Sequence, residues 1–199
     1  MNVDWIAVDW GTTHLRLWLM ATDGSVLDAR HSDRGMGTLT PSDYEPALLA
    51  LCEDALGQGP VPVIVCGMAG ARQGWAEAPY TNVPCTPPEA QSALQVPTQD
   101  QRLQVHILPG VSQRSPADVM RGEETQIKGV VATQDGFDGI ACLPGTHTKW
   151  AHLSAGEIVS FQTFMTGELF ALLSGQSVLR HSVAADGWDD TAFADAVDA

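Results

Sequence analysis

The chain has 199 residues, of which 44% are hydrophobic and 17% are charged, a composition typical of a globular protein with a substantial buried core. Its formal net charge of −14 argues against a general nucleic-acid or anionic-membrane surface, because such surfaces need clustered lysine and arginine. The four cysteines are scattered without C-x-x-C spacing, so the sequence signals neither a zinc site nor a disulfide framework.

The first predicted feature, at residues 4–18, is a hydrophobic strand that ends in an acid, then a glycine-threonine turn and a second strand. The first strand brings Asp9 to the edge of a sheet, and Gly11 lets the backbone bend tightly and approach an anion. Thr12 and Thr13 add hydroxyl and amide donors. This pattern predicts a loop that holds a phosphorylated nucleotide with a metal. A plain β-hairpin turn closed by hydroxyl-rich residues fits the same segment equally well.

The periodicity of the chain predicts an α/β protein that starts with a meander. Strands are expected near 3–8, 14–20 and 25–31, the last two joined by a Thr-Asp-Gly turn. A helix over 44–56 and a strand over 61–66 are predicted next, followed by loops or short pieces over 77–100. A strand is expected over 103–108 and a helix over 117–131, which ends near Gly129 and is followed by a turn over 133–136. The last predicted elements are a second meander over 140–161 and a helix over 163–174, capped by Thr163 or Thr166.

A segment similar to the first loop returns at residues 140–159. Both copies read Ile-Ala-x-x-x-Gly-Thr, then a strand, then a glycine turn that opens another strand. The repeat predicts two phosphate loops in a duplicated architecture. The match is short and needs a gap of two residues, so chance similarity stays an alternative.

These two loops resemble the phosphate-1 and phosphate-2 hairpins of the actin, sugar-kinase and Hsp70 superfamily, which clamp ATP between two related lobes. Longer stretches carry a narrower resemblance: Asp9-Trp10-Gly11-Thr12-Thr13-His14-Leu15-Arg16, Cys66-Gly67-Met68-Ala69-Gly70-Ala71-Arg72-Gln73-Gly74-Trp75, Pro109-Gly110-Val111-Ser112, Asp118-Val119-Met120-Arg121-Gly122-Glu123-Glu124-Thr125-Gln126, Leu143-Pro144-Gly145-Thr146-His147-Thr148-Lys149-Trp150 and Phe164-Met165-Thr166-Gly167-Glu168-Leu169-Phe170. In this order they resemble the 2-dehydro-3-deoxygalactonokinase family, the sugar-acid kinases of bacterial galactonate catabolism.

The resemblance implies ribonuclease H-like lobes of the actin/hexokinase type, with a mixed sheet, a β-meander and flanking helices. Residues 1–134 would form the first lobe, which binds the sugar and carries the first phosphate loop. Residues 135–199 would begin the second, ATP-binding lobe. Because relatives of this kind continue well beyond such a point, we expect the second lobe to be incomplete here and this chain alone to be weak or inactive as a kinase.

The implied activity is ATP- and Mg²⁺-dependent phosphorylation of 2-dehydro-3-deoxy-D-galactonate at its 6-hydroxyl. Two alternatives stay open: a kinase of another sugar or sugar acid in the same superfamily, and a nucleotide- or sugar-binding fragment without catalysis. The chain contains neither the G-x-x-x-x-G-K-[ST] motif of P-loop enzymes nor the protein-kinase motifs.

The resemblance also assigns the phosphate contacts. Asp9 would hold the metal through water, although a carboxylate that only caps the following turn is the plainer interpretation. The first loop would bind phosphate through Gly11, Thr12, Thr13 and Arg16, and the second through Gly145, Thr146, His147 and Lys149. An alternating strand could instead point Arg16 into solvent.

The acceptor hydroxyl needs a proton acceptor, and a carboxylate is the usual one. The segment 121–126 resembles the place where related sugar kinases carry Gly-Asp-Gln-Gln, which maps the base onto Glu123, with Glu in place of Asp. Neighbouring side chains on a helix point about 100° apart, so Glu123 and Glu124 cannot both reach one hydroxyl. Asp118 is the reserve candidate.

The carboxylate of a keto sugar acid needs a local cation in a strongly acidic protein. Arg72, with Gln73 beside it, is the first candidate, and a surface arginine on a loop is the plainer interpretation. Arg114 and Arg121 are further candidates that the sequence cannot rank. We expect a cytoplasmic protein whose partners are ATP and a small sugar acid, with no nucleic acid and no membrane, and a homodimer is one assembly left open.

Overall fold

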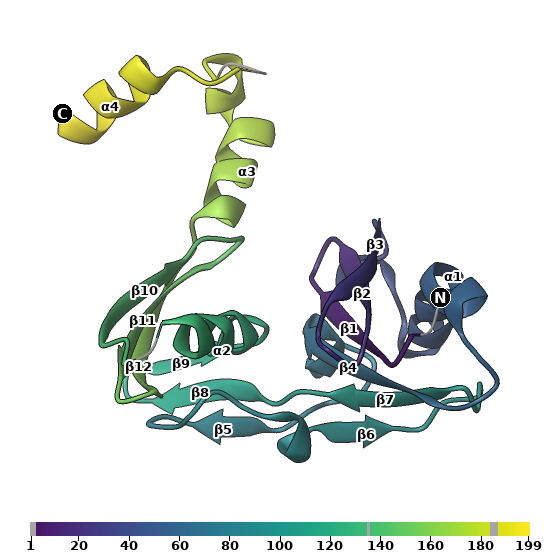
Figure 1. The fold of residues 1–199 in the computed structure, drawn as a ribbon. Coiled ribbons are helices and arrows are strands. Elements are labelled where there is room, and N and C mark those ends of the chain that lie inside the picture. The colour runs from purple at the N-terminus through teal and green to yellow at the C-terminus, as the bar shows by residue number, and fades with distance from the viewer. Residues whose placement is uncertain (1–2, 135, 184–186) are drawn as a thin grey trace. The chain divides into compact units, whose positions relative to one another are not determined.

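The computed structural model describes residues 3–134, 136–183 and 187–199 (Figure 1). The chain divides into two compact units. The first comprises Met1–Leu143 and Lys149–Thr163, and the second comprises Pro144–Thr148 and Phe164–Ala199. The predicted turn over 133–136 and the predicted lobe boundary after residue 134 involve Asp135, which lies outside the described residues. The two predicted lobes therefore stay a prediction.

A six-stranded mixed sheet lies in the first unit. Its strands, in spatial order, are β3 (Val26–Ser32), β2 (Leu15–Met20), β1 (Trp5–Trp10), β4 (Val61–Gly67), β7 (Leu103–Ile107) and β6 (Leu94–Val96). β1 pairs antiparallel with β2 and parallel with β4, and β4 pairs parallel with β7. This arrangement confirms the mixed α/β class, the first meander and the two strands predicted after it.

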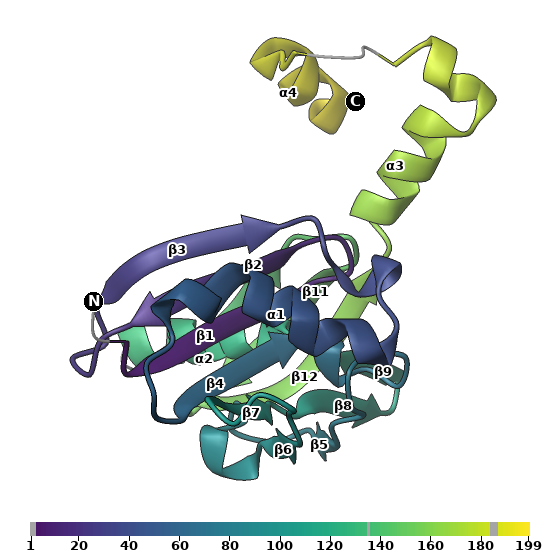
Figure 2. The ribbon, with the colours of Figure 1, turned by 90° about the vertical axis from the view of Figure 1, so that its right-hand side faces the viewer.

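Alternating burial explains why these segments form strands. Ile6, Val8 and Trp10 of β1 are buried, whereas the residues between them are only half-buried. The helix α1 (Tyr44–Cys52) packs against these buried side chains, and the ring centroids of Trp10 and Tyr44 lie 4.7 Å apart. Figure 2 shows α1 lying across the sheet. The helix is shorter than predicted, because a 3₁₀ turn, Glu53–Ala55, follows it.

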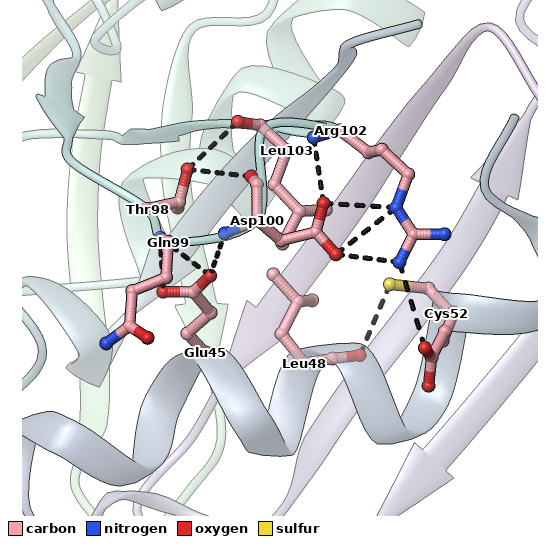
Figure 3. Close-up of polar contacts among 9 residues, drawn as sticks. Glu45, Leu48, Cys52, Thr98, Gln99, Asp100, Arg102 and Leu103 are labelled. Carbon is pink, nitrogen blue, oxygen red and sulfur yellow. Dashed lines mark hydrogen bonds and ion pairs between the residues drawn. The ribbon is translucent and has the colours of Figure 1, made fainter. Parts of the chain in front are cut away.

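Charged side chains anchor α1 to the segment that precedes β7. The Glu45 carboxylate accepts N–H bonds from Gln99, at 2.9 and 3.0 Å, and from Asp100, at 2.7 Å (Figure 3). The Asp100 carboxylate in turn accepts from the Arg102 guanidinium, with Nη2 and Oδ2 2.7 Å apart. These bonds fix the start of a central strand against the helix that covers the sheet.

The first unit also contains two small sheets and a helix. The strands are β5 (Tyr80–Asn82), β8 (Gly110–Arg114) and β9 (Ala117–Met120) in one sheet and β10 (Gly139–Leu143), β11 (Thr148–Ser154) and β12 (Glu157–Phe164) in the other, and the helix is α2 (Glu123–Thr133). The predicted second meander is thereby confirmed. Gln113 joins the two sheets: its Nε2 donates to the Phe161 carbonyl at 3.0 Å and its Oε1 accepts from the Phe161 N–H at 2.9 Å.

The helix predicted over 117–131 is wrong at both ends. Its first residues form β9, which pairs antiparallel with β8. Gly122, with φ +111°, ends the extended segment in a conformation that L side chains avoid, so α2 begins only at Glu123. Gly129 lies inside α2, which continues to Thr133, because a glycine within a helix costs only about 1 kcal/mol.

The second unit carries α3 (Gly167–Gly175) and α4 (Asp190–Asp198). The predicted helix start at Thr163 is wrong because that residue belongs to β12, whereas Thr166 occupies the N-cap position of α3 without a side-chain cap bond. Asp189 caps α4 by accepting N–H bonds from the first turn. Among the described residues, no helix is long and apolar enough to cross a membrane.

Asp100 makes folding stability depend on acid pH. Its bonds to the Arg102 side chain and backbone lower its pKa from 3.8 to about 2. The stabilisation is therefore present above about pH 4 and is lost as the pH falls toward 2. We expect Asp100→Asn to lower the free energy of unfolding at pH 7 and to flatten its decline between pH 4 and 2, measured by urea unfolding at a series of pH values.

The matched control is Asp195→Asn, which removes an exposed carboxylate from α4. It should leave both the free energy of unfolding at pH 7 and its acid dependence close to those of the wild-type protein. An equally steep acid decline in Asp100→Asn would contradict the assignment.

Candidate functional site

The loop between β1 and β2 has its carbonyl groups turned toward a later segment. The Gly11 N–H donates to the His14 carbonyl at 2.9 Å and closes the turn. The carbonyls of residues 11, 12 and 13 accept N–H bonds from Met36, Gly37 and Gly35, at 3.0, 2.9 and 3.1 Å respectively. The segment 35–37 therefore backs the loop along its carbonyl side.

The opposite side of this loop keeps its donors free. Within the described part of the chain, the N–H groups of Thr12 and Thr13 donate to no other residue, and both side chains are exposed. Successive unpaired backbone N–H groups in a turn form a concavity that attracts anions. The turn of the β1–β2 hairpin thus leaves two donors that an anion could use, and the phosphate loop stays a prediction.

Sequence reasoning missed the role of Gly35 and Gly37. A Cβ atom on Gly35 would lie 2.3 Å from the Thr13 carbonyl carbon and 2.4 Å from the Thr12 oxygen, so only glycine allows this contact. A Cβ on Gly37 would lie 3.2 Å from that same oxygen. The Gly-Met-Gly spacing after the third strand was the available signal, but nothing local indicates which loop it contacts.

Asp9 lies on β1 directly before the loop, opposite Arg16 of β2. Arg16 Nη1 lies 3.4 Å from Asp9 Oδ2, so this arginine pairs with the carboxylate in the structure. The Asp9 side chain keeps 31% of its surface exposed. The described residues hold no cluster of three or more metal-ligating side chains.

The end of β4 meets the loop region and the start of α2. Gly67 has φ +87°, and a Cβ there would lie 2.6 Å from the Trp10 carbonyl oxygen and 3.4 Å from Asp9 Oδ1. A Cβ on Gly122 would lie 3.3 Å from the Gly67 Cα. The Gly67 backbone therefore lies against Trp10, the residue after Asp9, on one side and against Gly122, the residue before Glu123, on the other.

The three candidate bases have different surroundings. Glu124 is 1% exposed, both its oxygens accept from the Gly122 N–H, and burial raises its pKa to about 7. Asp118 Oδ1 accepts from the Thr163 hydroxyl and the Val119 N–H, both at 2.8 Å.

Glu123 keeps 22% of its side chain exposed. Its Oε2 accepts the Arg121 N–H at 3.0 Å, and its Oε1 lies 3.9 Å from Nζ of Lys149. Glu123 is thus an oriented carboxylate with an open side, which a proton acceptor needs. Lys149, which the sequence placed with the phosphates, is buried on β11 beside this carboxylate.

The second loop, in the second unit, is backed in a similar way by the start of α3. The Gly145 carbonyl accepts the Gly167 N–H at 3.2 Å, and the Thr146 carbonyl accepts the Glu168 N–H at 3.0 Å. His147 Nε2 lies 2.5 Å from Glu168 Oε2, so this histidine is held by a carboxylate. In both loops a neighbouring segment binds the carbonyls.

Arg72 and Gln73 lie exposed on the loop that follows β4. This loop is held by its own backbone, since the Gly74 N–H donates to the Ala71 carbonyl at 2.8 Å and the Ala78 N–H to the Gly70 carbonyl at 3.0 Å. The Arg72 guanidinium is therefore presented to solvent by an ordered loop, which suits an anion contact.

The comparisons with known proteins agree on one family. The family model for 2-keto-3-deoxy-galactonokinase matches residues 9–199. The chain belongs to this family. A probable 2-dehydro-3-deoxygalactonokinase of Rhizobium meliloti is 43% identical over 197 residues, and the 2-dehydro-3-deoxygalactonokinase of Escherichia coli is 36% identical over 182 residues.

These alignments cover 96% and 90% of this chain but only 64% and 59% of the two relatives. A solved crystal structure of a Sinorhizobium meliloti protein, provisionally described as a 2-dehydro-3-deoxygalactonokinase, matches with a TM-score of 0.89 and 41% identity. That match covers 98% of this chain and 65% of the other. The chain thus spans less than two thirds of the galactonokinase relatives that it matches.

The backing of the first loop in this galactonokinase family member can be tested at Gly35. Gly35→Ala places a methyl group inside the Thr12–Thr13 backbone, so the loop must move. We expect the free energy of unfolding to fall by about 1 to 3 kcal/mol and the affinity for ATP to fall by about tenfold or more, measured by urea unfolding and by calorimetric titration.

Gly59→Ala is the matched control, because a Cβ there meets nothing within 4 Å. It should change neither quantity. A Gly35→Ala protein that loses stability but binds ATP normally would show that the 35–37 segment supports the fold and not the loop.

Proposed function

We propose that the protein carrying this chain transfers the γ-phosphoryl group of ATP to the 6-hydroxyl of 2-dehydro-3-deoxy-D-galactonate, a step in galactonate catabolism. The family match and the activity named for the curated relatives support this reaction. The observation that carries the proposal is the geometry of the first loop, which follows the strand that contains Asp9. Its carbonyls accept hydrogen bonds from residues 35–37, and the N–H groups of Thr12 and Thr13 remain available for phosphate oxygens.

Phosphoryl transfer needs positioned phosphates and compensation of developing negative charge. In the first loop, Thr12 and Thr13 would supply amide and hydroxyl donors to the phosphates. Gly11 would contribute only the tight bend, because its own N–H closes the turn onto His14. Arg16, which pairs with Asp9, would add a positive charge beside the phosphates. In the second loop, Gly145, Thr146 and His147 would contact the phosphates. Mg²⁺, when bound at Asp9 through water, would neutralise charge on the phosphate oxygens.

Glu123 is the proposed general base. It would take the proton from the 6-hydroxyl while that oxygen bonds to the γ-phosphorus and the bond from phosphorus to the bridging oxygen of ADP breaks. The Arg121 N–H orients the carboxylate by a hydrogen bond to Oε2, and the Lys149 ammonium lies 3.9 Å from Oε1. A fixed carboxylate reduces the loss of freedom needed to reach the reactive arrangement.

The carboxylate of the acceptor would bind at Arg72 and Gln73, the exposed pair on the loop after β4. Arginine suits this contact because its guanidinium donates two parallel hydrogen bonds to a carboxylate. A cytoplasmic location belongs to the same proposal.

The proposal is tested by ADP release from Mg-ATP with a panel of 2-keto-3-deoxy sugar acids, measured on this chain beside a C-terminally extended protein that spans the length of the relatives. We expect activity with the galactonate-derived acid to exceed that with the gluconate-derived acid, which differs at one hydroxyl. Preference for another acid would shift the proposal to a different acceptor within the superfamily. No activity with any acid in either protein, with ATP still binding, would contradict the kinase proposal and favour a binding protein without catalysis.

The role of Glu123 is tested by Glu123→Gln, which removes the proton acceptor but keeps the size of the side chain. We expect turnover to fall by roughly 10² or more, with ATP affinity mostly unchanged. Glu89→Gln, which changes an exposed glutamate paired with Lys128, is the control and should behave like the unchanged protein. Unchanged turnover in Glu123→Gln would move the assignment to Glu124 or Asp118.

A further inference from the structure

Arg121 is a buried arginine whose side chain has few partners. Only 9% of the residue is exposed, although arginine is seldom buried without an anionic partner. Its Nη2 donates to the Ala78 carbonyl at 2.9 Å, and its guanidinium carbon lies 4.3 Å from the centre of the Tyr80 ring. Among the described residues, Nε and Nη1 find no hydrogen-bond partner.

Two glycines make room for this arrangement. A Cβ on Gly70 would lie 2.7 Å from Arg121 Nη1. A Cβ on Gly110 would lie 2.7 Å from Cε1 of Tyr80. The guanidinium and the ring therefore fit only because both flanking positions lack side chains.

The backbone of Arg121 reaches in another direction. Its N–H donates to Glu123 Oε2 at 3.0 Å, and the next residue, Gly122, donates to the Glu124 carboxylate. The side chain of Arg121 thus contacts the loop that contains Arg72. Its backbone N–H orients Glu123, the proposed base.

This arrangement is costly if stability is its only purpose. Burying a charged group with unpaired donors is unfavourable, and an apolar side chain of similar size would commonly stabilise the fold as well or better. The buried Nε and Nη1 atoms are also closed to solvent, which argues against direct contact with a substrate carboxylate, the role that the sequence left open for this arginine.

We propose that Arg121 is a positioning residue that fixes the Met68–Ala78 loop relative to the first turn of α2. This assignment rests on the proposed function. Arg121 would set the distance between Arg72, the proposed contact for the acceptor's carboxylate, and Glu123, the proposed base for its hydroxyl. The side chain does so through the Ala78 carbonyl and the Tyr80 ring, without touching the substrate.

The first test is independent of activity. Arg121→Met keeps much of the side-chain volume but removes the bond to Ala78, so amide hydrogen exchange in residues 68–78 should accelerate by about tenfold or more. Lys128→Met, which removes an exposed cation from α2, is the matched control and should leave exchange in this loop unchanged. Unchanged exchange in Arg121→Met would overturn the proposal.

The second test separates positioning from general support of the fold. In Arg121→Met, the KM for the sugar acid should rise by about tenfold or more while the KM for ATP changes less than about twofold. Arg121→Lys, which can still donate to Ala78 and lie over the ring, should restore part of this loss. Equal increases in both KM values, or no rescue by lysine, would indicate a structural role only.

Tyr80→Leu is the variant to use if Arg121→Met does not fold, because it removes only the ring beneath the guanidinium. It should give a smaller change of the same kind in both the exchange and the KM of the acid. If the unchanged protein phosphorylates no acid in the panel, the proposed function fails, whereas the exchange experiment still decides whether Arg121 holds the loop.

Discussion

The candidate site depends on close backbone contact between β1, β4 and the start of α2. Gly67 approaches the Trp10 carbonyl so closely that a Cβ would lie 2.6 Å from it, and Gly122 fits against Gly67 from the other side. Both residues have positive φ, which glycine adopts without strain. Larger residues here would separate the strand that carries Asp9 from the helix that begins with Glu123, so the fold itself requires that these positions stay small.

Sequence patterns predicted the elements that are defined by local periodicity. The hydrophobic runs of β1 and β4 and the alternation in β7 read directly as strands, and Leu48, Leu49 and Cys52 follow helical spacing. The loop at Gly11 was also recognisable, because its glycine and threonines stand next to one another. These features need only neighbours in the chain.

The remaining features depend on distant contacts. Residues 117–120 lack a strong strand pattern and extend because β8 supplies their hydrogen-bond partners. Gly35 contacts Thr12 and Thr13 across more than twenty residues, and Arg121 contacts Ala78 across forty-three. Burial separates Glu124 from Glu123, whereas the sequence shows two adjacent and equivalent carboxylates. Single-sequence reasoning placed Glu123 first by family resemblance, but it could not show that burial sets Glu124 apart from its neighbour.

The backing of the first loop by residues 35–37 links ligand binding to folding. The loop itself spans residues 11–14, but the partners of its carbonyls lie at residues 35–37, beyond β2 and β3 in the chain. A ligand that binds the ordered loop and not the unfolded chain stabilises every element that this order requires. Nucleotide bound at this loop would thus stabilise β3 and the segment 35–37 together with the loop itself, although it touches neither of them.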